Sequence, residues 1–418
     1  MASTLSVAEL LSAARVRLPE MTAFLQDLVR LPSVNGRESE AAVAGRILAE
    51  AARLGMEGEL VAADPARPNA LVHWGEGRRG FVLVGHMDTV SEGLPAAWTY
   101  PPFEAHVAEG RVYGRGAADN KAGIACGVYT LALGRDLGLF DPAQVRLMLA
   151  GVVDEESGAS SRLGVRYLLD TGRLIGSLGG IYAYASDIVC IGHRGLLRLL
   201  LRASGKSVHT GSPAWSRGEG GVNAVTGLAA VLLRLEALHL PAPAHPAFAG
   251  LGCTLTPGTL MHGGEFESMV PAAAEALVDV RLMPGQDSVD VIRAVQEAIA
   301  AECALRPGLA VAIEIKNNLP GVALAPDHPL ARSAQRWTEA VTGKAWPIAG
   351  AGPANEGYML IGAGIPTLCG FGPTGGGAHA PDEWVEIDSL AETVAMYLGI
   401  MMDCFEAAQQ LQNNPSDI

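Results

Sequence analysis

Two side chains that can take part in metal binding end an apolar stretch near residue 85. His86 and Asp88 lie within residues 82–90, VLVGHMDTV, whose first residues predict a buried strand. Side chains at positions i and i+2 of an extended chain share a face, so these two would project together. An imidazole beside a carboxylate is a common pairing of a metal ligand with its hydrogen-bond partner. The same spacing also occurs by chance in proteins without a metal.

Further carboxylates and a second His follow predicted strands or lie in predicted loops. Asp119 precedes a helix of small residues, and Glu155 and Glu156 follow an apolar strand. Asp187 lies beyond the next apolar stretch, and His379 follows three Gly residues. Two His and several carboxylates suit two divalent ions, with zinc as the default and cobalt or manganese as options. One glutamate could bind metal while its neighbour accepts a proton from water, as metal-assisted hydrolysis requires.

The elements that must position these residues alternate between strands and helices. Strands are predicted at residues 70–73, 82–84, 145–153 and 367–371, and helices at 7–30, 38–54, 123–139, 164–169, 330–341 and 389–411. Residues 92–113 predict a long loop, and residues 413–418 a frayed tail. This alternation predicts an α/β fold, with a mostly parallel mixed sheet and helices on both faces.

A different pattern begins near residue 195. Strands are predicted at residues 195–204, 255–261, 274–283 and 309–316, and helices at 223–239 and 288–303, the second behind a Ser N-cap. This β-α-β-β-α-β order is that of a ferredoxin-like α+β unit. We therefore expect residues 195–318 to form a domain inserted into an α/β domain made of residues 1–194 and 319–418.

The net charge, the apolar stretches and the Cys residues limit which partners and which cellular compartment are expected. The chain has 418 residues and a formal net charge of −14, which argues against nucleic acid or an anionic membrane as a partner. No apolar stretch is long enough to span a bilayer, and the N-terminal residues lack the basic-then-apolar order of a signal peptide. The six Cys residues are scattered and predict reduced thiols. We expect a cytoplasmic protein.

Four motifs in succession, GHMDTV, GRGAADNKAG, DEESG and GGGAHAPDE, resemble the M20 family of metallopeptidases and amidohydrolases. That family includes carboxypeptidase G2-like enzymes, acetylornithine deacetylase and succinyl-diaminopimelate desuccinylase. The resemblance implies a zinc-peptidase-like catalytic domain with a general base, Glu155, and with Asp88 orienting His86. It also implies the metal ligands: His86 and Asp187 on the first ion, Asp119 bridging both ions, and Glu156 and His379 on the second.

The resemblance extends to the inserted domain, which in the family serves as a lid and a dimerisation surface and so implies a homodimer. In SVHTGSPAW, His209 would stabilise the oxyanion of the reaction. In GVNAV and DVRLMP, Asn223 and Arg281 would hold the substrate, with Arg281 binding a carboxylate through its planar fork. Asn223 could instead cap a helix, and Arg281 could instead pair with Asp279.

One departure from the family concerns the first ion. Members usually carry a carboxylate followed by Pro-Thr, well before a basic-Gly pair. Here no Glu-Pro-Thr precedes residues 193–195, and Asp187 is the only carboxylate nearby. If Asp187 is not a ligand, the first ion loses one donor and the enzyme could work with a single ion.

Two other positions leave alternatives open. Asn355 and Glu356 stand where many relatives carry a small residue followed by an acidic one, which bears on substrate choice. At the second ion, Asp382 or Glu383 could act as the ligand in place of His379.

The function implied is hydrolysis of the amide bond of an N-acyl amino acid or small peptide with a free carboxylate, by water activated by metal. One alternative is a deacetylase or desuccinylase of an intermediate in amino-acid biosynthesis. Another is an amine-releasing hydrolase acting on an unusual small molecule, for which Trp215 is a slight hint of an aromatic group. A non-catalytic binding protein on the same fold is the most distant alternative, and the intact pair of glutamates argues against it.

Overall fold

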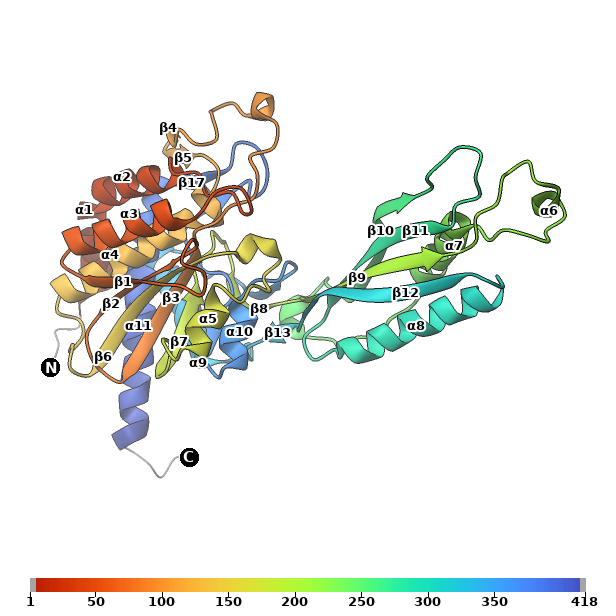
Figure 1. The fold of residues 1–418 in the computed structure, drawn as a ribbon. Helices are drawn as coiled ribbons and strands as arrows, with labels where there is room; N and C mark the ends of the chain where they lie inside the picture. Colours follow the sequence, from red (N-terminus) through yellow and green to blue (C-terminus); the bar gives the residue numbers. More distant parts are fainter. Residues whose placement is uncertain (1–4, 414–418) are drawn as a thin grey trace. The chain divides into compact units, whose positions relative to one another are not determined.

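The structure, a computed structural model, describes residues 5–413 (Figure 1). The chain divides into two compact units. The first takes in the chain up to Gly192, Ala323–Ala351 and the chain from Asn355 onward; the second is His193–Val322 with Gly352–Ala354. Among the described residues no helix is both long and apolar enough to cross a membrane. Most of the predicted tail, from residue 414 onward, lies outside the described residues.

The first unit is built on a six-stranded mixed sheet. Its strands, in spatial order, are β1 (Glu57–Val61), β2 (Asn69–Trp74), β6 (Val145–Val152), β3 (Arg79–His86), β7 (Ser177–Tyr182) and β15 (Thr367–Leu368). The four strands from β6 to β15 run parallel, and β1 and β2 pair antiparallel. The predicted mixed sheet is confirmed. Its parallel strands bring their carboxyl ends to one edge, where α/β proteins build their sites.

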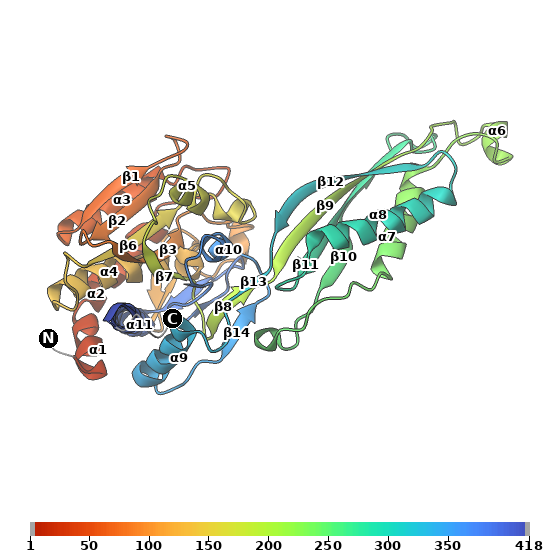
Figure 2. The same cartoon turned by 90° about the horizontal axis from the view of Figure 1, so that it is seen from below.

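Helices cover both faces of this sheet because apolar side chains alternate along the buried strands (Figures 1 and 2). Val82 and Val84 pack in a cluster with α5 (Val165–Asp170) and α10 (Gly357–Gly362). On the other face α4 (Ala122–Asp136) lies against β3 and β6. The remaining helices of the unit are α1 (Val7–Val16), α2 (Leu18–Val29), α3 (Ala41–Arg53), α9 (Pro329–Thr342) and α11 (Ile387–Asn413).

Two predictions for the first unit were wrong. Residues 7–30 form two helices, because Pro19 lacks the N–H that a continuous helix would need and lies instead in the first turn of α2. The predicted loop at residues 92–113 contains β4 (His106–Ala108) and β5 (Arg111–Tyr113). These form a small sheet with β17 (Trp384–Glu386) and β16 (Gly375–Gly376). β4 and β5 pair with each other, and β5 pairs on its other side with β17, more than 250 residues away, so no local pattern signals that second pairing.

The second unit is a four-stranded antiparallel sheet with two helices on one face. Its main elements are β9 (Gly195–Ser204), α7 (Ala224–Glu236), β10 (Thr254–Gly263), β11 (Ala273–Leu282), α8 (Ser288–Ala304) and β12 (Ala310–Leu319), with a short α6 (Pro213–Ser216). The sheet order β10-β11-β9-β12 confirms the ferredoxin-like unit. The helix α8 begins behind Asp287, whose side chain accepts from Val289 N, and not behind Ser288 as predicted.

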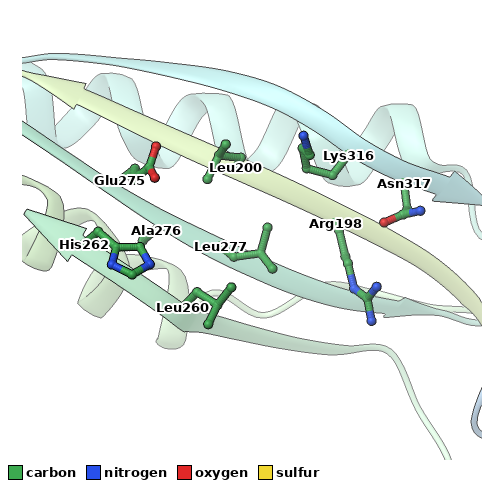
Figure 3. Close-up of a pocket in the computed structure, with 9 residues that line it drawn as sticks. All are labelled: Arg198, Leu200, Leu260, His262, Glu275, Ala276, Leu277, Lys316 and Asn317. Carbon is green, nitrogen blue, oxygen red and sulfur yellow. The ribbon is translucent and has the colours of Figure 1, made fainter. Parts of the chain in front are cut away.

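One face of this second sheet is covered and the other is open. Leu197, Leu199 and Leu201 of β9 are fully buried in a cluster with residues of α7 and α8. The intervening residues, among them Arg198 and Leu200, lie on the open face (Figure 3). Residues 352–354, which the sequence did not assign to this domain, join it where Arg194 Nε donates to the Gly352 carbonyl at 3.4 Å.

Beside the main sheets, the chain forms a three-stranded sheet of β13 (Val322–Ala323), β8 (Val189–His193) and β14 (Ile348–Ala351). Its strands come from three separate segments, so it assembles only as the fold closes.

Candidate metal centre

The end of β3 presents His86 in one defined orientation. The imidazole is fully buried, and its Nδ1 lies 2.9 Å from the backbone carbonyl oxygen of Asp88. A ring nitrogen that carries its hydrogen toward a carbonyl leaves the other nitrogen as the metal-binding atom. That other atom, Nε2, lies 2.8 Å from Asp119 Oδ1. Burial by itself lowers the pKa of His86, but this hydrogen bond and the charges of Asp119, Glu155 and Asp88 together raise it well above its usual value.

Asp88 organises the turn that carries the two glutamates. Its buried carboxylate accepts the backbone N–H groups of Glu155 at 3.2 Å and Glu156 at 3.0 Å. It also accepts a hydrogen bond of 2.6 Å from the side chain of Asn35. The contact with His86 is made by the backbone carbonyl of Asp88, whereas its carboxylate lies 3.7 Å from Nδ1. Besides orienting His86, Asp88 therefore fixes the backbone of the turn that carries Glu155 and Glu156, a role that the sequence did not indicate.

Asp119 lies between the two His residues. Its Oδ1 contacts His86, and its Oδ2 lies 3.3 Å from His379 Nε2. His379 Nε2 also lies 3.2 Å from Glu156 Oε1. His379 adopts a φ of +63°, a left-handed backbone conformation that costs free energy for a residue other than Gly and is often found at functional sites.

Among the described residues two groups of side chains could hold a metal ion. One comprises His86, Glu155 and Glu156, and the other comprises Asp119, Glu156 and His379. Within each group the ligand atoms lie within 4.8 Å of one another. Imidazole nitrogen and carboxylate oxygen are donors for zinc and similar divalent ions, so the residues fit such ions. Glu156 belongs to both groups, which places the two candidate sites side by side.

Asp187 is not brought to either group. Its side chain is exposed, in a bend where Ser186 Oγ donates to the Ile188 carbonyl and accepts from Ile188 N. The aromatic ring of Tyr184 lies against His86 instead, with ring centroids 5.5 Å apart. The expectation that Asp187 binds the first ion is therefore not supported, because the chain turns toward solvent before reaching that residue.

Glu383, considered above as a possible ligand, orders the loop that carries Asp119. Its Oε1 accepts the N–H groups of Ala118 and Asp119, each at 2.9 Å. Its Oε2 accepts from Gly116 N at 3.1 Å and from the buried guanidinium of Arg115 at 2.6 Å. Both carboxylate oxygens of Glu383 therefore accept hydrogen bonds from the loop of residues 115–119, and neither is directed to an ion. The sequence carried no signal for this role, since 264 residues separate Glu383 from Asp119.

Asp382, the other possible substitute for His379, is engaged elsewhere. Its carboxylate accepts from the backbone N and the hydroxyl of Thr99, at 2.7 and 2.8 Å. Of the three residues weighed for the second ion, only His379 belongs to a candidate ligand group.

Glu155, a member of the first group, is buried. Burial raises the pKa of its carboxyl to about 8; the charge of His86 opposes this, and nearby carboxylates, Glu156 foremost, add to it. A general base works best when its pKa is near the operating pH, so this environment suits proton transfer.

The pair Asn355 and Glu356 lies at the start of α10. Asn355 donates to the Cys369 carbonyl and accepts from Gly357 N at 2.9 Å, so it fixes the backbone there. Glu356 is fully buried and accepts a hydrogen bond of 3.2 Å from the Tyr182 hydroxyl. Burial, reinforced by the charge of Glu155, raises the pKa of Glu356 well above its usual value.

Three predicted site residues belong to the second unit, and the structure defines their surroundings there. His209 is exposed, and its Nδ1 accepts from Gly211 N at 3.0 Å. Asn223 Oδ1 caps α7 by accepting from Thr226 N at 3.1 Å. Arg281 Nε donates to Asp279 at 2.7 Å. The helix cap at Asn223 and the ion pair of Arg281 are the alternatives noted from the sequence. The roles of these two residues in substrate binding stay predictions.

A mixed α/β sheet beside two adjoining candidate groups of His and carboxylate ligands, one of which includes the buried Glu155, has the features of a metal-dependent hydrolase. Residues 82–403 match peptidase family M20/M25/M40. The chain belongs to this family, which confirms the resemblance seen in its motifs.

Relatives and solved structures agree with this assignment. The chain is 29% identical over 399 residues to a succinyl-diaminopimelate desuccinylase of Cereibacter sphaeroides, covering 92% of this chain and 98% of that protein. It is 27% identical over 350 residues to an acetylornithine deacetylase of Vibrio campbellii, covering 82% and 85%. The fold resembles an M20 family metallo-carboxypeptidase of Sulfolobus solfataricus, with a TM-score of 0.71, 16% identity, and coverage of 92% and 99%. It also resembles a dinuclear metal-binding M20 peptidase of Bacillus subtilis, with a TM-score of 0.69, 16% identity, and coverage of 94% and 99%.

We expect metal affinity to rise with pH. In the metal-free protein, hydrogen bonds with Asp119 and then with Glu156 raise the pKa of His379 to about 10. Below that pKa an ion must displace the imidazole proton, so protons compete with metal. For this one proton the dissociation constant for zinc should fall by about tenfold per pH unit between about pH 6.5 and about pH 9. Competition with a chromogenic chelator measures it. A pH-independent affinity would contradict this linkage.

Replacing Glu383 should disorder the loop that carries Asp119. In Glu383→Gln the buried Arg115 loses its charged partner, which should lower the free energy of unfolding by about 3 kcal/mol or more. Chemical denaturation and metal content by elemental analysis should both show the loss. The neighbouring change Asp382→Asn, which affects only the contact with Thr99, should leave metal content unchanged. Equal metal loss in both variants would mean that Glu383 has no special role.

Proposed function

We propose that the protein hydrolyses the amide bond of an N-acyl amino acid or a small peptide with a free carboxylate. The observation that carries this proposal is the position of Glu155, which is buried within the candidate ligand group of His86 and next to the group of Asp119 and His379. The names of the desuccinylase and deacetylase relatives favour an acylated amino acid as the substrate. The similarity of the fold to metallo-carboxypeptidases is compatible with a short peptide.

His86, Asp119, Glu156 and His379 would hold two divalent ions, with zinc as the expected metal and cobalt or manganese as substitutes. When bound, such ions polarise the substrate carbonyl and lower the pKa of water. With Asp187 turned to solvent, the donors left for the first ion would be His86, Asp119 and the glutamates grouped with His86.

Glu155 would act as the general base. Burial raises the pKa of its carboxyl, so its carboxylate is a stronger base that can take the proton of the attacking water, and the acid so formed can deliver it to the leaving amine. The hydrogen bond from Glu155 N to Asp88 holds the backbone at this point, which limits the movement of the carboxyl group between the two steps.

The second unit would supply the groups that meet the rest of the substrate. His209 is exposed, and because its Nδ1 accepts from Gly211 N, its Nε2 is the nitrogen that would carry a hydrogen and donate to the oxyanion. Arg281 would bind the substrate carboxylate, and the amide nitrogen of Asn223 would contribute a further donor. We further propose a cytoplasmic homodimer that associates through this unit.

A deacetylase or desuccinylase acting in amino-acid biosynthesis is the nearest specific form of this function, favoured by the relatives' names. Release of free amino acid from a panel of acetyl, succinyl and peptidyl substrates, with added zinc, cobalt or manganese, would identify the preferred acyl group. The alternative of a non-catalytic binding protein gains no support from membership of a hydrolase family.

Glu155→Gln should separate catalysis from metal binding. The amide cannot take a proton from water, so kcat should fall by about 10²–10⁴-fold, while the metal content should stay at the wild-type level. Glu156→Gln is the matched comparison, because that residue belongs to both ligand groups and its loss should remove metal. Turnover measured together with elemental analysis tests both variants. Near-wild-type turnover in Glu155→Gln would refute the proposed mechanism.

His209→Ala should lower kcat by about 10²-fold or more without changing the metal content, because it removes an oxyanion donor and no metal ligand. Steady-state kinetics and elemental analysis on the same preparation provide the test. If this variant lost its metal, the assignment of His209 to the oxyanion would be wrong.

A further inference from the structure

The open face of the sheet in the second unit gathers positive charge around one carboxylate. Arg281 Nε donates to Asp279 Oδ1 at 2.7 Å, and Arg281 Nη2 donates to Oδ2 at 3.3 Å. Arg198 Nε donates to the same Oδ2 at 3.1 Å. Arg198 and Asp279 are directly paired across β9 and β11, so the three side chains lie on one face. Two guanidinium groups therefore share a single carboxylate.

A third guanidinium adds to this excess. Arg194 donates to the carbonyl oxygens of Gly252 at 3.0 Å and Gly352 at 3.4 Å, which carry no full charge. Burial and then the positive charge of Arg281 lower the pKa of Arg194. Within a chain whose net charge is −14, this corner of the second unit is locally positive and suits an anion.

The geometry at Arg281 leaves one edge of its guanidinium for a ligand. The two hydrogen bonds to Asp279 use Nε and one N–H of Nη2. The terminal edge, made of Nη1 and the second N–H of Nη2, faces away from Asp279 and matches a planar carboxylate in a bidentate arrangement. Asp279 thus fixes the plane of the guanidinium before any ligand arrives, which reduces the entropy lost on binding.

A second ion-pair cluster on the same face is balanced in charge. Arg202 donates to Glu275 at 2.6 Å and to Glu314 at 3.2 Å, and Lys316 Nζ donates to Glu314 at 3.0 Å, so two cations meet two carboxylates. Leu200 and Leu277 lie between Arg198 and Glu275 and separate the two clusters (Figure 3). Arg202 lies on the same strand and face as Arg198, which makes it a matched control.

We infer that Asp279 and Arg198 are positioning residues for Arg281, and that together they select substrates with a free carboxylate. Asp279 holds the guanidinium of Arg281 in place. Arg198 partly neutralises the charge of Asp279, so Asp279 does not fully neutralise Arg281. This inference rests on the proposed function, in which Arg281 binds the substrate carboxylate.

The test compares steady-state kinetics on an N-acyl amino acid and on its carboxamide, using the metal-loaded full-length enzyme. Arg198→Met should raise KM for the carboxylate by about tenfold, leave kcat unchanged and leave the carboxamide unaffected. Arg198→Lys, which keeps the charge, should recover most of the affinity. Arg202→Met should leave KM unchanged.

The variant Asp279→Ala distinguishes a role in positioning the Arg281 guanidinium from a purely electrostatic role. Removing this carboxylate makes the site more positive, so a purely electrostatic role predicts a lower KM. Positioning predicts a KM about tenfold higher, because the guanidinium is no longer held. If the Ala variant does not fold, as thermal unfolding would show, Asp279→Asn keeps the shape, loses one of the two bonds to Arg281 and should also raise KM.

Failure of this inference can be told apart from failure of the proposed function. Arg281→Met should raise KM for the carboxylate substrate; no change would overturn the proposed role of Arg281, and this inference with it. If Arg281→Met raises KM while Arg198→Met or the Asp279 variants do not, the positioning role alone is refuted. An equal rise in KM in Arg202→Met would also overturn it, because the effect would then reflect any loss of charge on this face.

Discussion

The carboxylate of Asp88 connects the ends of two neighbouring parallel strands, and the candidate metal centre depends on that connection. Strands β3 and β6 are paired in register as far as His86 and Val152. Just beyond this pair, Asp88 accepts the N–H groups of Glu155 and Glu156, while its own carbonyl orients His86. One residue therefore sets the positions of a candidate ligand, the proposed base and a candidate ligand shared by both groups, without itself belonging to either group.

The candidate metal centre has more carboxylates than imidazoles. Carboxylates from Asp88, Asp119, Glu155 and Glu156 gather around His86 and His379, and their mutual repulsion favours cations. The loop that carries Asp119 needs a separate anchor, which Glu383 provides through backbone N–H groups. Since Glu383 is itself paired with Arg115, its buried charge is compensated locally. The fold thus keeps the anchoring carboxylate apart from the carboxylates that face an ion.

The second unit shows the complementary arrangement of charge. Its open sheet face places Arg198 and Arg281 on a single aspartate, whereas the first unit places several carboxylates around two His residues. A substrate with a cleavable amide and a free carboxylate requires both kinds of surface: ligands for cations that act on the carbonyl, and cations that hold the carboxylate. The charge distribution of the chain therefore matches the substrate class proposed for it.

Local sequence was sufficient to predict several buried strands, β3 and β6 among them, and the residues at their ends. Apolar runs identify β3 and β6, and the motifs that follow them carry His86, Glu155 and Glu156. The order of elements in the inserted domain was equally readable, because alternation along a strand and helical periodicity are properties of neighbouring residues. Tertiary structure alone decided the outward turn at Asp187, the anchoring role of Glu383, the pairing of β5 with β17 and the ion pair of Arg198 with Asp279. The last three join segments far apart in the chain and so leave no local pattern, while the exposure of Asp187 depends on how the chain leaves the sheet, which its residue type does not determine.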